Sequence, residues 1–242
     1  MDWTLLSWVT AGVFIIATLY ASVGHAGASG YVAVMTLAGL APTVVKPTAL
    51  ILNILVALIA TWQFAPYCEW RRFWPFALLA LPLAFVGGYF TAPPEVFKRL
   101  VGGVLWLSAI RLWLPKSVEG EPRFPSIALA LPSGAAIGLL AGLTGTGGGI
   151  FLTPLLLLAR WAETKTASAV SAAFILGNSL AGLLGYVASA SPLPALIWPL
   201  LVAALAGGWL GSYLGSRRLP PRVIERALSA VLIVAGGKLL FG

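Results

Sequence analysis

Charged residues are scarce in this chain. Asp, Glu, Lys and Arg make up 9% of its 242 residues, hydrophobic residues make up 60%, and the mean hydropathy is +0.96. Ordinary soluble domains contain about 25% charged residues. The composition therefore excludes such a domain, and we expect an integral protein of the plasma (inner) membrane that is surrounded by the lipid bilayer.

Cysteine and histidine are almost absent. The chain has one cysteine, Cys68, and one histidine, His25. A single cysteine excludes an internal disulfide and a cysteine-rich metal site, and a single histidine excludes a site built from several histidines. We therefore expect neither a metal nor a cofactor.

Acidic residues are missing from the apolar stretches. All seven Asp and Glu residues lie at the ends of these stretches or in loops. Proton relays and sodium sites in membranes usually use a buried carboxylate. Coupling to protons would therefore have to use His25, whose side chain titrates near neutral pH.

Proline, glycine and charge divide the chain into about ten apolar segments, five on each side of a polar linker. We predict an all-α polytopic membrane fold with about 8–10 transmembrane segments, built as two inverted repeats with short broken helices. The repeats are residues 1–114 and 126–242, and the linker is 115–125. The segments are about 5–23, 31–41, 47–65, 73–91, 96–114, 126–142, 149–160, 166–189, 195–216 and 222–240.

Basic residues dominate the charge, and the net charge is +8. They gather at segment ends, which the positive-inside rule and anionic headgroups explain, so we expect no nucleic-acid partner. If segments 31–41 and 149–160 complete a crossing, most basic residues fall on one side of the membrane. The positive-inside rule makes that side cytoplasmic, and both termini then lie on the non-cytoplasmic side. If these segments dip in and return, the repeats run parallel instead.

Two glycine-rich breaks interrupt the apolar segments at matching places, residues 24–30 and 142–149. Paired non-helical breaks at membrane depth are the best sequence pointer to a transport site. The first N–H groups of a helix are unpaired and carry about half a positive charge, and glycine lets a ligand reach them. We predict that helices starting near Ser29 and Gly148 bind a small oxyanion, which moves by alternating access.

The candidate substrate-binding residues come from both breaks and from two amides inside apolar runs. They are Gly24, His25, Gly27, Ser29, Gly30, Asn53, Thr144, Gly145, Thr146, Gly147, Gly148, Gly149 and Asn178. An interhelical hydrogen bond is an equal alternative for the two amides, because an unpaired amide is costly in an apolar environment. Lys46 and Lys165 are candidates for attracting the anion, with contact to lipid headgroups as their alternative role.

Other glycines recur at a spacing of four residues. They are Gly134, Gly138 and Gly142, and Gly207, Gly211 and Gly215. This spacing is typical of close packing between membrane helices, so we assign these glycines to packing.

Longer motifs surround both breaks. They are Gly142 to Pro154, with Asn178 to Gly182 downstream, and in the first half His25 to Tyr31 and Lys46 to Asn53. With these motifs the chain resembles the TauE/SafE family of sulfite and organosulfonate exporters over nearly its whole length. The resemblance implies a membrane transporter, not an enzyme, that exports a sulfur-containing anion. The first break departs from the family motif because it lacks three consecutive glycines. It carries His25 and Ser29 where the second break carries bare glycine, so we expect the two halves to differ, with selectivity or gating in the first half.

Other functions stay open. One is a proton-coupled anion carrier that uses His25. Another is an intramembrane serine protease, because Gly27 to Gly30 fits the Gly-x-Ser-Gly pattern of rhomboid proteases, although a histidine base would have to reach Ser29 from another helix. A structural membrane protein without transport is a third. A homodimer is also left open.

Overall fold

The computed structural model describes most of the chain, with gaps that fall mainly between residues 91 and 125 and after residue 191. The described residues are 3–22, 24–90, 93, 95–96, 99–100, 102–103, 106, 109–110, 122–124, 126–191, 198–217, 226, 229, 233 and 237. The predicted linker and the predicted segments 96–114 and 222–240 lie largely outside them. Every regular element within the described residues is a helix, which confirms the all-α prediction.

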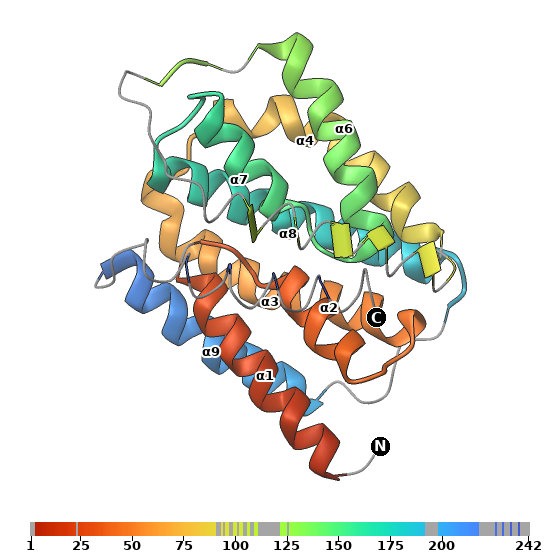
Figure 1. Cartoon of the computed structure of the whole chain (residues 1–242). Helices are drawn as coiled ribbons and strands as arrows, with labels where there is room; N and C mark the ends of the chain where they lie inside the picture. The colour runs from red at the N-terminus through yellow and green to blue at the C-terminus, as the bar shows by residue number, and fades with distance from the viewer. Residues whose placement is uncertain are drawn as a thin grey trace.

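The helices follow the predicted segments in order (Figure 1). The first half contains α1 (Trp3–Ala21), α2 (Ala28–Leu37), α3 (Pro42–Phe64), the short 3₁₀ turn η1 (Ala65–Tyr67) and α4 (Trp70–Tyr89). The second half contains α6 (Ile127–Thr144), α7 (Gly149–Leu158), α8 (Thr164–Ala188) and α9 (Trp198–Arg217).

Six of these helices are long and apolar enough to cross a membrane, namely α1, α3 with η1, α4, α6, α8 and α9. The chain is therefore a multi-pass membrane protein. Helices α2 and α7 have only 10 residues each. At 1.5 Å per residue each rises about 15 Å, half of the roughly 30 Å hydrocarbon core, so both are the short helices predicted next to the glycine breaks.

Helices α3 and α8 pack against each other in the middle of the molecule, with the α1–α9 pair on one side and the α4–α6 pair on the other (Figure 1). If α1 to α4 correspond in order to α6 to α9, the α1–α9 contact corresponds to the α6–α4 contact. The α3–α9 contact then corresponds to α8–α4. These matched contacts are those that a twofold relation between two repeats would produce. Whether the repeats are inverted stays a prediction.

The glycines spaced by four pack against backbone, as predicted. A β-carbon on Gly134, Gly138 or Gly142 of α6 would collide with a carbonyl oxygen of α4, at Phe76, Ala80 and Ala84 respectively. On α9, a β-carbon at Gly207, Gly211 or Gly215 would meet the carbonyls of Phe14 and Thr18 of α1 and of Ser22, which directly follows α1. Only glycine permits these close helix approaches.

Helix α3 begins at Pro42, earlier than the predicted start at residue 47, and Pro47 lies inside it. Proline has no N–H, so Pro47 leaves the carbonyl of Thr43 without its helical donor. The hydroxyl of Tyr186 on α8 donates to this carbonyl at 2.9 Å. A partner helix therefore satisfies the group that the proline frees, as a membrane interior requires.

Candidate functional site

Both predicted breaks are real interruptions of helix. The chain leaves α1 at Ala21 and enters α2 at Ala28, and it leaves α6 at Thr144 and enters α7 at Gly149. All but one of the described glycines with a positive φ lie in these breaks; they are Gly24, Gly27, Gly145, Gly147 and Gly148, with Gly39 outside. Residues 24–31 and 144–150 are buried. Protein therefore encloses both stretches of non-helical backbone.

The first break ends at Gly27, which precedes α2 with φ of 97°. The N–H of Tyr31 donates to the carbonyl of Gly27 at 2.9 Å, and this is the first backbone bond of the helix. The N–H groups of Ala28, Ser29 and Gly30 donate to no backbone carbonyl within the described residues. They are the unpaired, partly positive donors that a helix N-terminus presents.

The second break ends at Gly148, with φ of 81°. Its carbonyl accepts from the N–H groups of Phe151 and Leu152, both at 3.1 Å. The N–H groups of Gly149 and Ile150 donate to no backbone carbonyl in the part of the chain that the structure describes. The two breaks thus present the same kind of donor.

Two fully buried amides lie against the second break. Nδ2 of Asn53, on α3, is 2.9 Å from the position that a β-carbon on Gly147 would take. Nδ2 of Asn178, on α8, is 3.2 Å from the corresponding position on Gly148. Both side chains have no exposed surface. The structure therefore brings both predicted amides to the predicted break, from two different helices.

The hydrogen bonds of these amides are long. Asn53 donates to Oγ of Ser179 at 3.4 Å, and Asn178 donates to the carbonyl of Gly147 at 3.5 Å. Ordinary N–H···O bonds span about 2.7–3.2 Å. The amide oxygen of each asparagine has no partner within the described residues. The predicted interhelical bond thus exists for Asn53, but it is weak and leaves hydrogen-bonding capacity unused.

His25 connects the two breaks. Its Cδ2 lies 3.4 Å from the position of a β-carbon on Gly149, at the start of α7. Its Nε2 is 2.7 Å from Oγ1 of Thr153, and this hydroxyl donates to Oγ of Ser171 at 2.7 Å. The two breaks therefore meet, as the shared-site prediction requires.

Other predicted side chains are engaged locally. Ser29 shares a 2.9 Å hydrogen bond with the hydroxyl of Tyr20. Thr144 donates to the carbonyl of Leu140 at 2.7 Å, and its hydroxyl is 2.9 Å from that of Thr146. The serine protease arrangement is absent among the described residues, because Ser29 pairs with Tyr20 while His25 pairs with Thr153.

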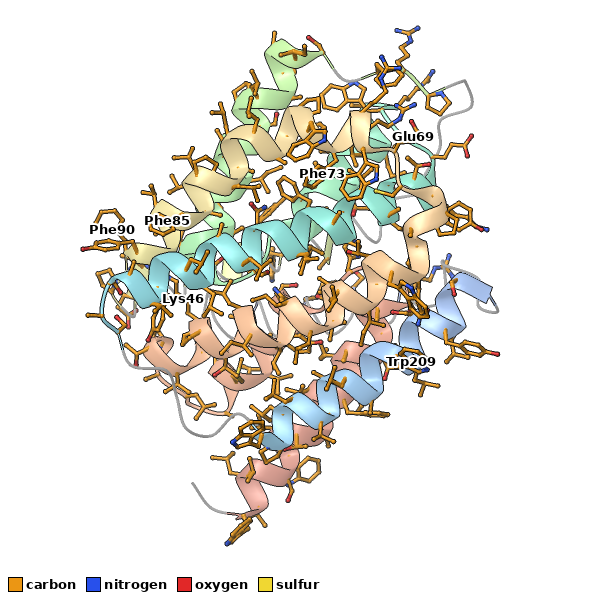
Figure 2. All side chains as sticks on the ribbon, turned by 180° about the vertical axis from the view of Figure 1, so that it is seen from behind. Lys46, Glu69, Phe73, Phe85, Phe90 and Trp209 are labelled. Atoms are coloured by element: carbon orange, nitrogen blue, oxygen red, sulfur yellow. The ribbon has the colours of Figure 1, made fainter. Side chains whose placement is uncertain are left out.

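The Lys46 ammonium points away from the breaks, although the backbone of Lys46 touches Gly145. The side chain is 1% exposed, and Nζ donates to the carbonyls of Gly87, Gly88 and Phe90 at 3.0, 2.9 and 2.6 Å (Figure 2). A cation on the last carbonyls of α4 interacts favourably with the helix dipole. This contact replaces the predicted alternative of reaching lipid headgroups.

Lys165 lies apart from the breaks. Its ammonium donates to the hydroxyl of Tyr67 at 3.2 Å and lies 4.7 Å from the centre of the same ring. Tyr67 is the last residue of η1, in the α3–α4 connection, and Lys165 lies in the first turn of α8. The structure therefore does not bring Lys165 together with the other predicted site residues.

Sequence reasoning missed four side chains near the breaks, which are Tyr31, Thr153, Ser171 and Ser179. Hydroxyl residues are common in membrane helices, and no local sequence pattern distinguishes these four from the other hydroxyl residues of the chain. Only their tertiary contacts with His25, Asn53 and Gly27 reveal them.

Comparisons with known proteins agree with the sequence motifs. The family model described as "Sulfite exporter TauE/SafE" matches residues 9–239. "Probable membrane transporter protein y4hK" of Sinorhizobium fredii is 42% identical over 235 residues, which cover 94% of this chain and 95% of that protein. "Probable membrane transporter protein YunE" of Bacillus subtilis is 30% identical over 108 residues, 43% of this chain and 38% of that protein. No solved structure matches the chain significantly.

Proposed function

Because the chain belongs to the sulfite exporter TauE/SafE family and is a multi-pass membrane transporter, we propose that it exports a small sulfur-containing oxyanion of the sulfite or organosulfonate class. The anion binds where the two glycine breaks meet. It is held by the N-termini of α2 and α7 and moves by alternating access between the two repeats.

The observation that carries this proposal is the pair of buried amides at the start of α7. An anion that leaves water needs hydrogen-bond donors, and Asn53 and Asn178 bring two amide nitrogens to Gly147 and Gly148. The free N–H groups of the first turn of α7 point to the same end of the helix, where the dipole is positive. The present bonds of both amide nitrogens are long, so each nitrogen can exchange a weak bond for a stronger one to the anion.

The tight packing of the breaks supports alternating access. A β-carbon on Gly147 would already lie 2.8 Å from Cγ2 of Ile175 and 3.0 Å from Oγ of Ser179. An anion is larger than a methyl group, so binding requires the surrounding helices to separate. Helix α8 carries Ile175 and Ser179, and a shift of α8 relative to α7 would open the break.

Proton coupling through His25 is the second candidate, and one observation favours it. The chain of contacts from His25 through Thr153 to Ser171 joins a titratable ring to two hydroxyl groups. Such a chain can pass a proton between its members. It joins the two halves at the proposed binding site, where coupling would have to act.

The proposal is tested by anion binding and flux. We expect purified protein to be stabilised against heat by at least one of sulfite, thiosulfate, sulfoacetate, taurine and sulfate, and to carry that compound across the membrane of proteoliposomes. Asn53→Leu and Asn178→Leu should each lower the flux at least tenfold, because a hydrogen bond to a charged group contributes about 1.5–3 kcal/mol.

A matched control is Ser189→Ala. It removes a polar side chain at the end of α8, where Ser189 donates to the carbonyl of Tyr186, away from both breaks. Its flux should equal that of the wild type. Wild-type protein that neither binds nor carries any compound of the panel would refute the proposed function, and full flux in both asparagine variants would refute the binding site.

A further inference from the structure

Tyr31 lies in the first turn of α2, immediately after the first break. Its ring is fully buried, and its backbone N–H makes the first bond of the helix to Gly27. Its hydroxyl oxygen lies 2.9 Å from the position of a β-carbon on Gly27. The phenol therefore folds back over the residue that precedes α2, and its polar end lies at the helix N-terminus.

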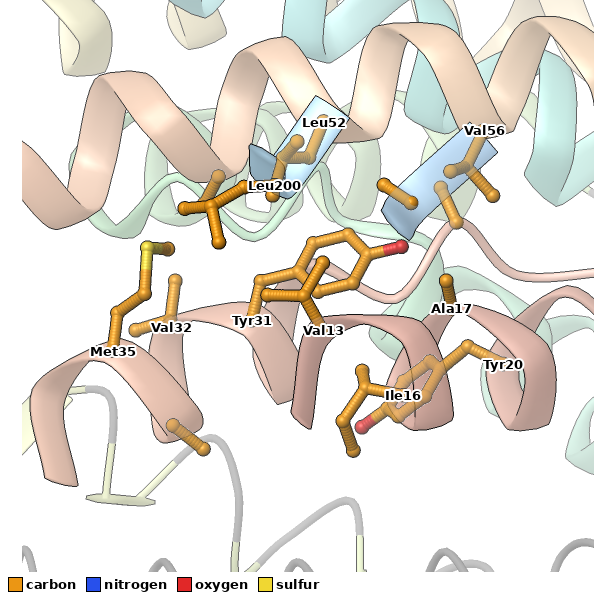
Figure 3. Close-up of a cluster of buried hydrophobic side chains, with 14 of the residues drawn as sticks. Val13, Ile16, Ala17, Tyr20, Tyr31, Val32, Met35, Leu52, Val56 and Leu200 are labelled. Atoms are coloured by element: carbon orange, nitrogen blue, oxygen red, sulfur yellow. The ribbon is translucent and has the colours of Figure 1, made fainter. Parts of the chain in front are cut away.

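This hydroxyl has no hydrogen-bond partner within the described residues. Figure 3 shows the Tyr31 ring among apolar side chains such as Val13, Leu52 and Val56, which offer no acceptor. Burial of an unpaired hydroxyl costs free energy, and phenylalanine would fill the same space without that cost. Packing alone therefore does not explain a tyrosine at this position.

The neighbouring tyrosine shows the difference. Tyr20 also lies beside the first break, where its ring approaches Gly30, but its hydroxyl pairs with Ser29 at 2.9 Å. One of the two buried phenols is satisfied by the protein, and the other is held at the N-terminus of α2 with its donor unused.

We propose that the Tyr31 hydroxyl donates a hydrogen bond to the transported oxyanion and is a specificity residue of the first half. This inference rests on the proposed function. The phenol adds a directed donor to the free N–H groups of Ala28, Ser29 and Gly30 without adding a positive charge that would hold the anion too tightly for release. An oxygen of a sulfite or sulfonate group is a suitable acceptor for all of these donors.

An anion can reach this hydroxyl only when the break opens, because a β-carbon on Gly27 would already lie 2.9 Å from it. The ring stays on α2, and an anion that enters the opened break replaces the missing acceptor. Each half then contributes a different donor to the same ligand, a phenol from the first half and asparagine amides beside the glycines of the second. This difference in donors would explain physically why the two halves are expected to differ.

The test compares Tyr31→Phe with Tyr186→Phe in purified protein, with sulfite as the first probe and the other panel anions after it. Both variants remove one hydroxyl from a buried ring. For Tyr31→Phe we expect the Kd for the anion to rise at least tenfold, while the Tm without anion stays equal or rises. For Tyr186→Phe we expect an unchanged Kd and a lower Tm, because the carbonyl of Thr43 loses its donor.

The outcomes separate the two proposals. If the wild type binds none of the panel anions, the proposed function fails. If the wild type binds an anion and Tyr31→Phe binds it equally well, the role of Tyr31 fails while the proposed function stands. A fall in Tm without anion for Tyr31→Phe, with the Kd unchanged, would show a structural hydroxyl and would also overturn the inference.

Discussion

Glycine matters at single positions in this protein for two separable reasons, backbone conformation and space. Gly147 has φ of 69°, and a β-carbon there would also press on Asn53 and Ser179. Gly39 has φ of 79°, yet a β-carbon there would meet nothing within 4 Å. The two residues share the left-handed conformation and differ only in their surroundings.

Alanine substitutions at these glycines separate the cost of the left-handed backbone conformation from the effect of the new methyl group on its neighbours. Gly147→Ala and Gly39→Ala should each cost about 1–2 kcal/mol of stability from the left-handed conformation. Gly147→Ala should in addition lower anion flux at least tenfold, because the new methyl group displaces Asn53. Gly39→Ala should leave the flux per folded molecule unchanged. Thermal denaturation and proteoliposome flux measure the two effects, and equal flux in both variants would contradict a binding role for the second break.

At the scale of helices, small residues and prolines are matched by features of the neighbouring helix. The glycines of α6 face carbonyls of α4, and those of α9 face carbonyls of α1. Under the proposed correspondence of the halves, these are equivalent interfaces with the glycines on opposite partners. The spacing of four residues predicts such an interface from sequence, but it does not identify the partner helix.

Pro47 and Tyr186 form an energetic pair between α3 and α8. Tyr186→Phe should destabilise the protein by about 1–3 kcal/mol, since the carbonyl of Thr43 is left unsatisfied. In a Pro47→Ala background the alanine N–H supplies the missing helical donor, so the same Tyr186→Phe change should cost at least 0.5 kcal/mol less, a typical coupling for residues in contact. Reversible denaturation of the four proteins measures this coupling, and additive costs would show that the hydroxyl does not compensate the proline.

At the scale of the whole molecule, buried cations hold both ends of α4; Figure 2 labels Lys46 at its last residues and Glu69 at its start. Lys46 binds the last carbonyls of the helix. At its start, Arg72 binds Glu69 at 2.6 Å and the carbonyls of Arg123 and Trp161. Arg72 thus joins α4 to Arg123, in the predicted linker between the repeats, and to Trp161, in the α7–α8 connection of the second half. These contacts are expected to change if the halves move during transport.

The absence of acidic residues from the apolar stretches bears on what would drive the proposed export. An inside-negative membrane of 100 mV favours the exit of a monovalent anion by about 2.3 kcal/mol, or roughly fiftyfold in concentration. We therefore expect flux in proteoliposomes to follow an imposed voltage and to ignore a pH gradient. Flux that strictly requires the pH gradient would favour the proton-coupled alternative, and in that case His25→Gln should abolish the dependence on pH.

Much of this architecture can be predicted from the sequence, because it depends on interactions between residues close together along the chain. Apolar length predicts the spanning helices, clusters of glycine predict where helix stops, and the shortness of segments 31–41 and 149–160 predicts α2 and α7. Helices α2 and α7 begin at Ala28 and Gly149, each within one residue of the starts predicted near Ser29 and Gly148, although α2 begins three residues before segment 31–41. Such features depend on neighbours along the chain and require no knowledge of the fold.

Tertiary structure alone decides which polar groups meet. Asn53 and Asn178 are distant in sequence, yet both reach one glycine break because α3 and α8 pack in the middle of the molecule. Lys46 turns to the end of α4, and the buried hydroxyl of Tyr31 finds no partner among the residues that the structure describes. The hydrogen-bond partner of a buried polar group depends on which helices lie side by side. Hydrophobic periodicity along the sequence does not show which helices are neighbours.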